Sequence, residues 1–171
     1  MELLKKYAYA PSDQEVADGL RDIESGMAAE PSAEILRKCF SIMDLTTLSP
    51  SDTPESVSRL VAKVTRLTTE YPSYPLPASI CVYPNCASVV RSERCSEDLH
   101  VTTVASCFPS TQSFLPVKVL ECELAVRNGA DEIDIILSLS SFLSGDKDAA
   151  FAEIKAMREA IDREAERHGR Q

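Results

Sequence analysis

The sequence has few glycines and no long apolar run. Only five of its 171 residues are glycine and none of them cluster, so the P-loop and G-x-G-x-x-G patterns that cradle phosphates are absent. No apolar stretch approaches about 20 residues, and the N-terminus lacks the apolar core of a signal peptide. We therefore expect no transmembrane helix and a cytoplasmic location.

Metal-ligand spacing is also missing. The six cysteines form no C-x-x-C pair, and the two histidines, His100 and His168, lie far apart in the sequence. A zinc site is not expected, and no other cofactor is indicated. In a cytosolic chain the cysteines should be reduced thiols, several of them buried as small hydrophobic side chains.

The composition is that of a soluble globular protein with an acidic surface. Hydrophobic residues make up 44% of the chain, the net charge is -9 and the pI is about 4.8. An acidic surface repels nucleic acids and anionic membranes, so neither is expected as a partner. A small anionic substrate stays open, because a local basic pocket could bind it.

The order of apolar patterns predicts an α/β protein. A helical extension over residues 1–40, with Ser12 and Glu15 at capping-box spacing, precedes a β/α domain over residues 41–171. Strands are predicted at 41–45, 79–83, 101–107 and 132–137. Helices are predicted at 53–69, 84–94, 113–127 and from 146 to about 168, with a loop at 138–145. Strict alternation favours a parallel sheet with right-handed crossovers.

Two aspartates lie within apolar, strand-like runs. Asp44 follows Ile42-Met43, and Asp134 lies between Ile133 and Ile135. Alternation places Asp134 on the face opposite the apolar residues of its strand, where α/β enzymes carry catalytic groups. A structural role is an open alternative: Asp134 could bond a lysine or the backbone, and Asp44 could begin a turn.

A nucleophile is harder to find. Cys81 lies within a predicted strand, but neither histidine is an evident base for it, so a buried inert thiol is the expected interpretation. The seven lysines all fall in predicted helices or loops, and none ends a strand. A Schiff-base lysine needs a partly desolvated site, which none of these positions suggests.

Four motifs in order resemble the deoxyribose-phosphate aldolase family. They are MDLTTL at 43–48, ICVYP at 80–84, CFP at 107–109 and NGADEIDI at 128–135. The resemblance implies a (β/α)8 barrel of TIM type and a class I aldolase. Such an enzyme cleaves 2-deoxy-D-ribose 5-phosphate reversibly to acetaldehyde and glyceraldehyde 3-phosphate, through a lysine Schiff base and without a metal, in deoxyribonucleotide catabolism.

By the same resemblance, Asp134 is the proton-relay acid, Asp44 a supporting acid and Cys81 a residue lining the substrate pocket. The family's two active lysines and its phosphate site lie on later strands and loops, which these 171 residues do not contain. We therefore expect a truncated half barrel that is inactive alone. The alternatives are a non-catalytic half-barrel assembly module, an incomplete polypeptide, or another α/β enzyme that uses Asp134 and Cys81.

A half barrel has consequences for association. Four strands cannot close, so we expect exposed sheet edges and an apolar lumen face, both of which favour contact with other chains. The expected partners are a second copy of the chain or a missing C-terminal half.

Overall fold

The computed structural model describes residues 11–27 and 31–169, and the chain divides into two compact units, Met1–Leu36 and Arg37–Gln171. In the first unit, α2 (Asp13–Gly26) begins at a capping box. The Ser12 hydroxyl accepts from the Glu15 backbone N–H at 3.2 Å, and the Glu15 carboxylate accepts from the Ser12 N–H at 2.7 Å. This confirms the cap predicted from the sequence. The helix buries none of its described residues.

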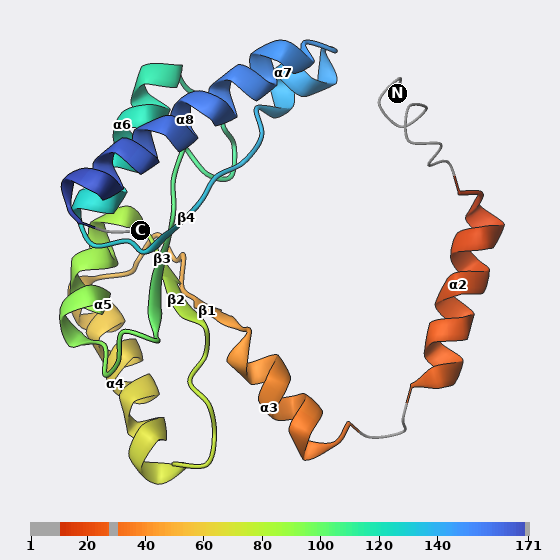
Figure 1. The fold of residues 1–171 in the computed structure, drawn as a ribbon, viewed down its shortest axis with the longest axis vertical. Coiled ribbons are helices and arrows are strands. Elements are labelled where there is room, and N and C mark those ends of the chain that lie inside the picture. The colour runs from red at the N-terminus through yellow and green to blue at the C-terminus, as the bar shows by residue number, and fades with distance from the viewer. Residues whose placement is uncertain (1–10, 28–30, 170–171) are drawn as a thin grey trace. The chain divides into compact units, whose positions relative to one another are not determined.

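The second unit is built on a parallel four-stranded sheet. Its strands are β1 (Asp44–Thr46), β2 (Ser79–Val82), β3 (His100–Val104) and β4 (Glu132–Asp134), and their spatial order is β1-β2-β3-β4. Figure 1 shows the four strands side by side at the centre of this unit. The alternating α/β architecture predicted from the sequence is therefore confirmed.

Helices precede, connect and follow the strands, and two of them begin at a side-chain cap. They are α3 (Ala33–Ser41), α4 (Pro54–Glu70), the 3₁₀ turn η1 (Pro84–Cys86), α5 (Ala87–Glu93), α6 (Leu115–Arg127), α7 (Leu139–Leu143) and α8 (Lys147–Arg167). Thr53 caps α4 with Pro54 in the first turn, and the Asp146 carboxylate accepts from the Ala149 N–H at 2.9 Å to cap α8. Both caps satisfy backbone donors that have no partner within the helix.

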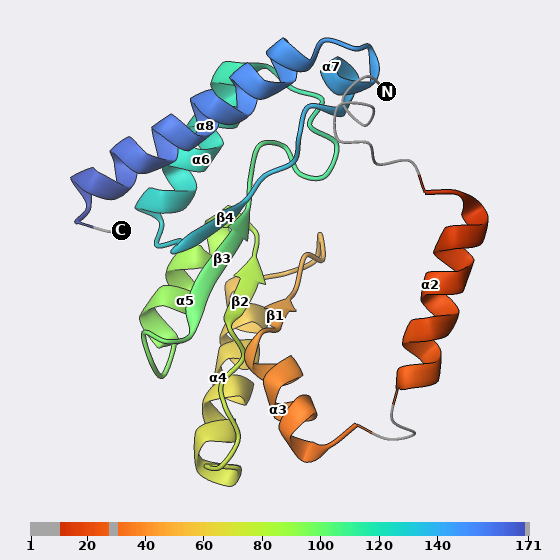
Figure 2. The ribbon, with the colours of Figure 1, turned by 45° about the vertical axis from the view of Figure 1, so that its right-hand side comes forward.

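One face of the sheet packs under these helices. Val57, Val61 and Val64 of α4 and Val90 of α5 are buried against strand residues such as Ile80, Val82 and Val101. Cys122 of α6 and Met157 of α8 form a second cluster with Ile133. Figure 2 shows α4, α5, α6 and α8 on the same side of the sheet. Burial of these apolar side chains is the main source of stability in this unit.

The other face is polar, and here the expectation of an apolar lumen face is wrong. Alternation and strand register place the following residues on it: Asp44, Thr46, Ser79, Cys81, His100, Thr102, Glu132 and Asp134. Only Val104 of β3 adds an aliphatic side chain to this set. The exposed edges fit the expectation better, because β1 and β4 each pair with a single neighbour among the described strands.

Four element predictions need correction. The first strand covers Asp44–Thr46 rather than residues 41–45, because α3 continues to Ser41, and the third strand ends at Val104 rather than residue 107. The fourth strand ends at Asp134 rather than residue 137, because its partner β3 ends at Val104 and the chain then enters positive φ at Ser106 and Cys107. The ladder has no further partner beyond that point. The predicted loop at 138–145 contains the one-turn helix α7, whose residues include Leu139 and Leu143.

No helix in residues 11–27 and 31–169 is both long and apolar enough to cross a bilayer.

Gly129 has a left-handed backbone conformation and lies close to the Arg91 side chain. Its φ is +117°, and a Cβ built there would lie 3.0 Å from Arg91 Cβ. We expect Gly129→Ala to lower the free energy of unfolding by roughly 1–3 kcal/mol, because Ala pays for the left-handed backbone and displaces Arg91. Urea unfolding followed by circular dichroism measures this. Gly19→Ala in α2, where nothing lies within 4 Å, is the control and should not destabilise; equal stability of Gly129→Ala and the parent would contradict the prediction.

Candidate active site

Strand register brings the three residues singled out from the sequence to one face of the sheet. Asp44 pairs with Ser79, Cys81 lies between Thr46 and Thr102, and Asp134 pairs with Val104. Adjacent residues in register share a face, so Asp44, Cys81 and Asp134 all lie on the polar face. Asp44 and Asp134 occupy the two edge strands, and Cys81 lies on a strand between them.

Asp134 is held in a way that favours its protonated form. Its pKa is raised, first by partial burial and then by the negative charges of Asp44 and Glu132. No hydrogen bond or ion pair joins its carboxylate to another side chain in the part of the chain that the structure describes. The alternative in which a lysine neutralises Asp134 is therefore not found among those residues.

Cys81 is buried and protonated. It is 3% exposed, and burial together with the charges of Asp134 and Asp44 raises its pKa to about 11. Electrostatic influence from both aspartates shows that the three groups share one local environment. A thiol in such surroundings is a poor nucleophile, because the reactive species is the thiolate.

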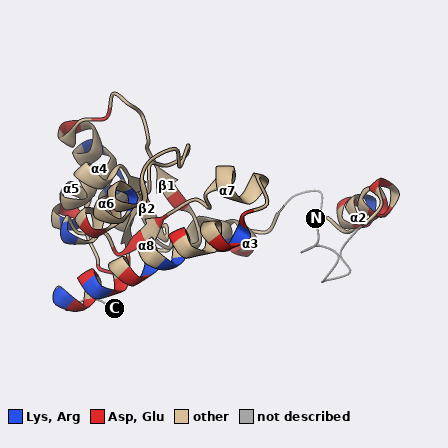
Figure 3. Cartoon of the chain, turned by 90° about the horizontal axis from the view of Figure 1, so that it is seen from above, with Lys and Arg blue, Asp and Glu red and all other residues tan. Residues whose placement is uncertain are grey.

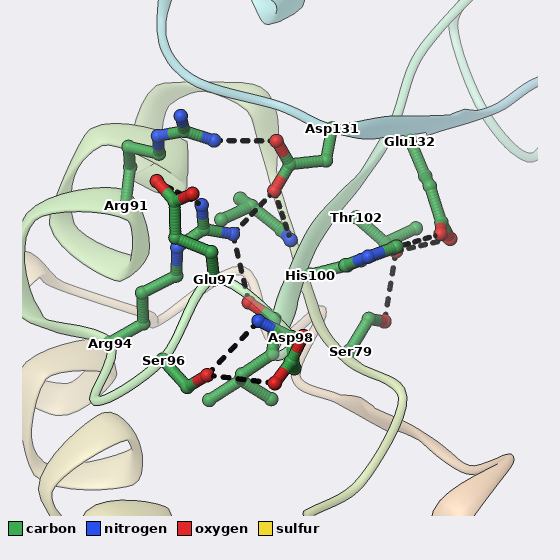
Figure 4. A network of polar contacts seen from close by, with 12 residues as sticks. Ser79, Arg91, Arg94, Ser96, Glu97, Asp98, His100, Thr102, Asp131 and Glu132 are labelled. Atoms are coloured by element: carbon green, nitrogen blue, oxygen red, sulfur yellow. Dashed lines mark hydrogen bonds and ion pairs between the residues drawn. The ribbon is translucent and has the colours of Figure 1, made fainter. Parts of the chain in front are cut away.

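A row of polar contacts crosses the same face. Ser79 Oγ donates to Asp44 Oδ1 at 2.7 Å, and Thr102 Oγ1 lies 2.8 Å from Ser79 Oγ and 3.1 Å from Glu132 Oε2. His100 Nδ1 lies 2.6 Å from Glu132 Oε1. Figure 4 shows Ser79, Thr102, Glu132 and His100 in this row. Ser79 and Thr102 are fully buried, whereas Glu132 and His100 are about half exposed.

Sequence reasoning missed most of this row. It placed Glu132 at the start of the fourth predicted strand and gave Ser79, Thr102 and His100 no role in the site. The available signal was polar alternation at 100, 102 and at 79, 81 within otherwise apolar strands. Which strand lies beside which is a tertiary property, so the pairing of His100 with Glu132 was not visible in the local pattern.

A separate ion cluster fixes the start of β4. Arg91 and Arg94 lie 2.5 Å and 2.6 Å from the two oxygens of Asp131, and Asp131 also accepts from the Val101 backbone N–H at 3.1 Å. The Arg94 side chain is 6% exposed and donates to the Leu99 carbonyl at 2.9 Å. Figure 4 places this cluster beside the polar row. These contacts tie α5 to the β3 and β4 backbone.

The described lysines lie away from the aspartates. Lys118 of α6 is the buried one, with a side chain 2% exposed, and its Nζ lies 2.7 Å from the Glu153 carboxylate of α8. Lys155 pairs along α8 with Glu159, and Figure 3 shows acidic and basic residues mixed along that helix. No hydrogen bond or ion pair joins a described lysine to Asp44, Cys81 or Asp134. In the same part of the chain, no group of three or more His, Cys, Asp or Glu is arranged to hold a metal ion.

The raised pKa of Asp134 predicts a pH-dependent effect of Asp134→Asn. A carboxyl whose folded pKa exceeds its unfolded value stabilises the fold fully below the unfolded pKa, and this contribution is lost as pH rises through the folded pKa. Asp134→Asn, which mimics the neutral acid, should therefore be more stable than the parent at pH 7, and the gain should vanish below about pH 3. Urea unfolding at the two pH values measures this. Asp131→Asn is the control and should destabilise at pH 7, because it breaks the pairs with Arg91 and Arg94; a loss of stability in Asp134→Asn at pH 7 would contradict the assignment.

Comparison with known sequences finds deoxyribose-phosphate aldolases. The chain is 33% identical to the Homo sapiens enzyme over 149 residues, which are 77% of this chain and 44% of the human protein. It is 32% identical to the Bos taurus enzyme over 164 residues, 82% of this chain and 49% of the bovine protein. A Caenorhabditis elegans protein assigned to the same activity is 36% identical over 152 residues, 86% of this chain and 49% of that protein. No family model matches the chain.

Solved structures agree with the sequence comparison. The aldolase QR15 superposes with a TM-score of 0.62 at 27% identity, covering 72% of this chain and 51% of its own. The tetrameric deoxyribose-phosphate aldolase of Aeropyrum pernix has a TM-score of 0.54 at 23% identity, covering 77% of this chain and 57% of its own, which supports the fold alone. The four β/α units thus correspond to about half of a TIM-type aldolase barrel.

The chain spans about half the length of the curated relatives it matches. Over that span the resemblance read from the four sequence motifs is confirmed by both sequence identity and fold. The chain is therefore similar, in sequence and in structure, to about half of the deoxyribose-phosphate aldolases.

Proposed function

We propose that this chain supplies the carboxylate part of a class I aldolase site that acts on 2-deoxy-D-ribose 5-phosphate. The reaction is reversible retro-aldol cleavage to acetaldehyde and glyceraldehyde 3-phosphate, a step of deoxyribonucleotide catabolism. The observation that carries the proposal is the placement of Asp134 and Asp44 on one polar face, where the charge of Asp44 helps to raise the pKa of Asp134. Similarity to named deoxyribose-phosphate aldolases supports the substrate class.

The proposed chemistry divides between an amine and an acid. An imine formed by a lysine amine withdraws electrons from the bond that breaks, while a nearby group accepts and returns protons. Asp134 suits the second task, because a raised pKa brings a carboxyl closer to the operating pH. Asp44 acts on Asp134 through its charge and is proposed as the supporting acid. Cys81 lines the pocket between them as a neutral thiol.

The amine is proposed to come from outside these 171 residues. Lys118, the buried lysine among the described ones, is committed to Glu153 between α6 and α8 rather than to the polar face. An ammonium in a buried ion pair keeps its proton and cannot attack a carbonyl. Lysines of the exposed helix surfaces lack the desolvation that an imine-forming amine needs.

The same proposal implies a partner that supplies the missing β/α units of the barrel. β1 and β4 are sheet edges with unpaired backbone groups on their outer sides, and further β/α units added to both edges would complete a barrel. Those units could belong to a second polypeptide or a second copy of the chain. Such an assembly would cover the carboxylates and exclude water from the site.

A non-catalytic assembly module is the second candidate. The exposed edges alone favour it, since an edge needs a partner whether or not chemistry follows. The two candidates differ in what the assembled barrel does: the aldolase requires Asp134, whereas a module does not.

Complementation tests the proposal. Alone, the chain treated with deoxyribose 5-phosphate and borohydride should keep its mass, because it offers no imine-forming amine. Mixed with a polypeptide covering the part of the human enzyme that this chain does not match, it should release acetaldehyde. Asp134→Asn in the mixture should lower kcat by about 10²-fold or more, the usual contribution of a proton-transfer group.

The control for this experiment is Asp98→Asn, on the loop before β3 and outside the polar face. It should leave cleavage unchanged in the mixture. A reduced adduct on the chain alone would refute the assignment of the amine. Association without cleavage would favour the assembly module.

A thiol enzyme that uses Cys81 is the third interpretation, and alkylation tests it. With a pKa of about 11, Cys81 is thiolate in about one molecule in ten thousand at pH 7. Iodoacetamide at pH 7.5 should therefore label the exposed Cys39 and Cys95 and spare Cys81 in the folded chain. Peptide mapping by mass spectrometry measures the labelling, and a urea-unfolded sample is the control in which Cys81 should react. Labelling of folded Cys81 as fast as Cys95 would support the thiol enzyme.

A further inference from the structure

The polar row across the sheet connects two carboxylates through two buried hydroxyls. Its three oxygen–oxygen gaps are Asp44 to Ser79 at 2.7 Å, Ser79 to Thr102 at 2.8 Å and Thr102 to Glu132 at 3.1 Å. All three are hydrogen-bond distances. Ser79 and Thr102 are fully buried, so no bulk water can take the place of either hydroxyl.

Counting hydrogens shows that this row is one proton short when both ends are ionised. A hydroxyl carries one hydrogen and a carboxylate carries none. Ser79 and Thr102 therefore offer two hydrogens for three gaps. One gap would then bring two oxygen atoms together without a hydrogen, which is costly in a buried position. One added proton, on either carboxyl, satisfies all three gaps at once.

We propose that this row is a one-proton relay that links Asp44 on β1, along the polar face, to Glu132 on β4 and His100 on β3. With the proton on Asp44, Asp44 donates to Ser79, Ser79 to Thr102 and Thr102 to ionised Glu132. In the transfer, the Asp44 O–H bond breaks as its proton bonds to Ser79 Oγ, the Ser79 hydrogen passes to Thr102 Oγ1, and the Thr102 hydrogen passes to Glu132 Oε2. Both hydroxyls end neutral, and one proton has moved from Asp44 to Glu132.

His100 gives the far end of the relay access to solvent. Its Nδ1 lies 2.6 Å from the second Glu132 oxygen, and both side chains are 49% exposed. Histidine is the side chain best suited to exchange protons with water near neutral pH. Protons can therefore reach the Asp44 end along the row, starting from the half-exposed His100–Glu132 pair.

Other charged groups face the row from each neighbouring element. Asp134 of β4 and the Cys81 thiol of β2 share the polar face, and the pKa of Asp134 is raised in part by Asp44 and Glu132. His100 and Glu132 also line a hollow of about 470 Å³ at the other end, with Arg91, Arg94, Glu97, Asp131 and Gly169. Arg91 and Arg94 pair with Asp131, and Arg94 also lies 3.8 Å from Glu97, so two negative charges balance the two positive ones there.

The use of this relay in catalysis rests on the proposed function, in which Asp44 supports Asp134. The relay itself depends only on the row of oxygens. Ser79, Thr102, Glu132 and His100 are thus positioning residues that set the protonation of Asp44, and the test below reads that protonation directly, with no substrate and no partner.

Carbon-13 NMR of the Asp44 carboxyl in the 171-residue chain tests the relay. Glu132→Gln supplies an amide hydrogen to Thr102, which lets Thr102 donate to Ser79 and Ser79 to ionised Asp44. The titration midpoint of Asp44 should then fall by more than removal of the Glu132 charge alone produces, because the ionised form of Asp44 becomes fully hydrogen-bonded. Removal of the Glu132 charge also lowers the midpoint directly, because the three gaps place the Asp44 and Glu132 carboxylate oxygens within about 9 Å of each other.

The background at position 102 separates the two effects. In Thr102→Ser, which keeps the hydroxyl, the fall caused by Glu132→Gln should persist; in Thr102→Val, which removes it, the fall should shrink to the direct-charge value. Ser79→Ala removes the other hydroxyl of the row and serves as the alternative if Thr102→Val does not fold. In Ser79→Ala, too, the fall caused by Glu132→Gln should shrink to the direct-charge value. An equal fall in every background, or none in the parent, would overturn the relay, whereas failure of the aldolase assay alone would leave it standing.

Discussion

The pleat of a short parallel sheet is the constraint on which the rest of the structure depends. Successive side chains of a strand point to opposite faces, so each strand divides its residues between the helix layer and the polar face. Ile80, Val101 and Ile133 go to the helices, and Ser79, Thr102 and Glu132 go to the other side. A shift of one residue in any strand would bury carboxylates under helices and expose the core, so the packing of the core fixes the geometry of the site.

Helix starts and the faces of strand residues could be predicted from short sequence patterns, because both depend on residues close together in the chain. The Ser12–Glu15 capping box predicted the start of α2, and the helix starts predicted at 53 and 146 coincide with the observed caps Thr53 and Asp146, whose side chains satisfy backbone donors a few residues away. Period-two alternation predicted that Asp134 and Ile133 lie on opposite faces of the sheet, because the face of a side chain follows from its position along a single strand. Short α7 was missed, because its single turn lies within a serine-rich stretch with no helical period.

What the sequence could not predict depends on which strands become neighbours. The contact of His100 with Glu132 joins residues 32 positions apart, and the Ser79–Thr102 bond joins residues 23 apart. The expected apolar lumen was wrong for a related reason. That face holds residues from four strands, and its polarity emerges only when Asp44, Ser79, Thr102 and Glu132 are seen together. These are also the residues that carry the proposed chemistry, where local rules are most often broken.

The proposed function depends on Asp134, whose carboxylate has no hydrogen bond or ion pair with a lysine among the described residues. Asp134 lies on an accessible polar face with its pKa raised, while the buried Lys118 is held by Glu153 in the helix layer. A crystal structure of the chain assembled with the complementary half of the human enzyme, after borohydride reduction with deoxyribose 5-phosphate, tests this most directly. The account predicts a reduced sugar bonded to a lysine of the added half, with its carbon chain beside Asp134. A sugar bonded to Lys118 or to any other lysine of this chain would contradict it.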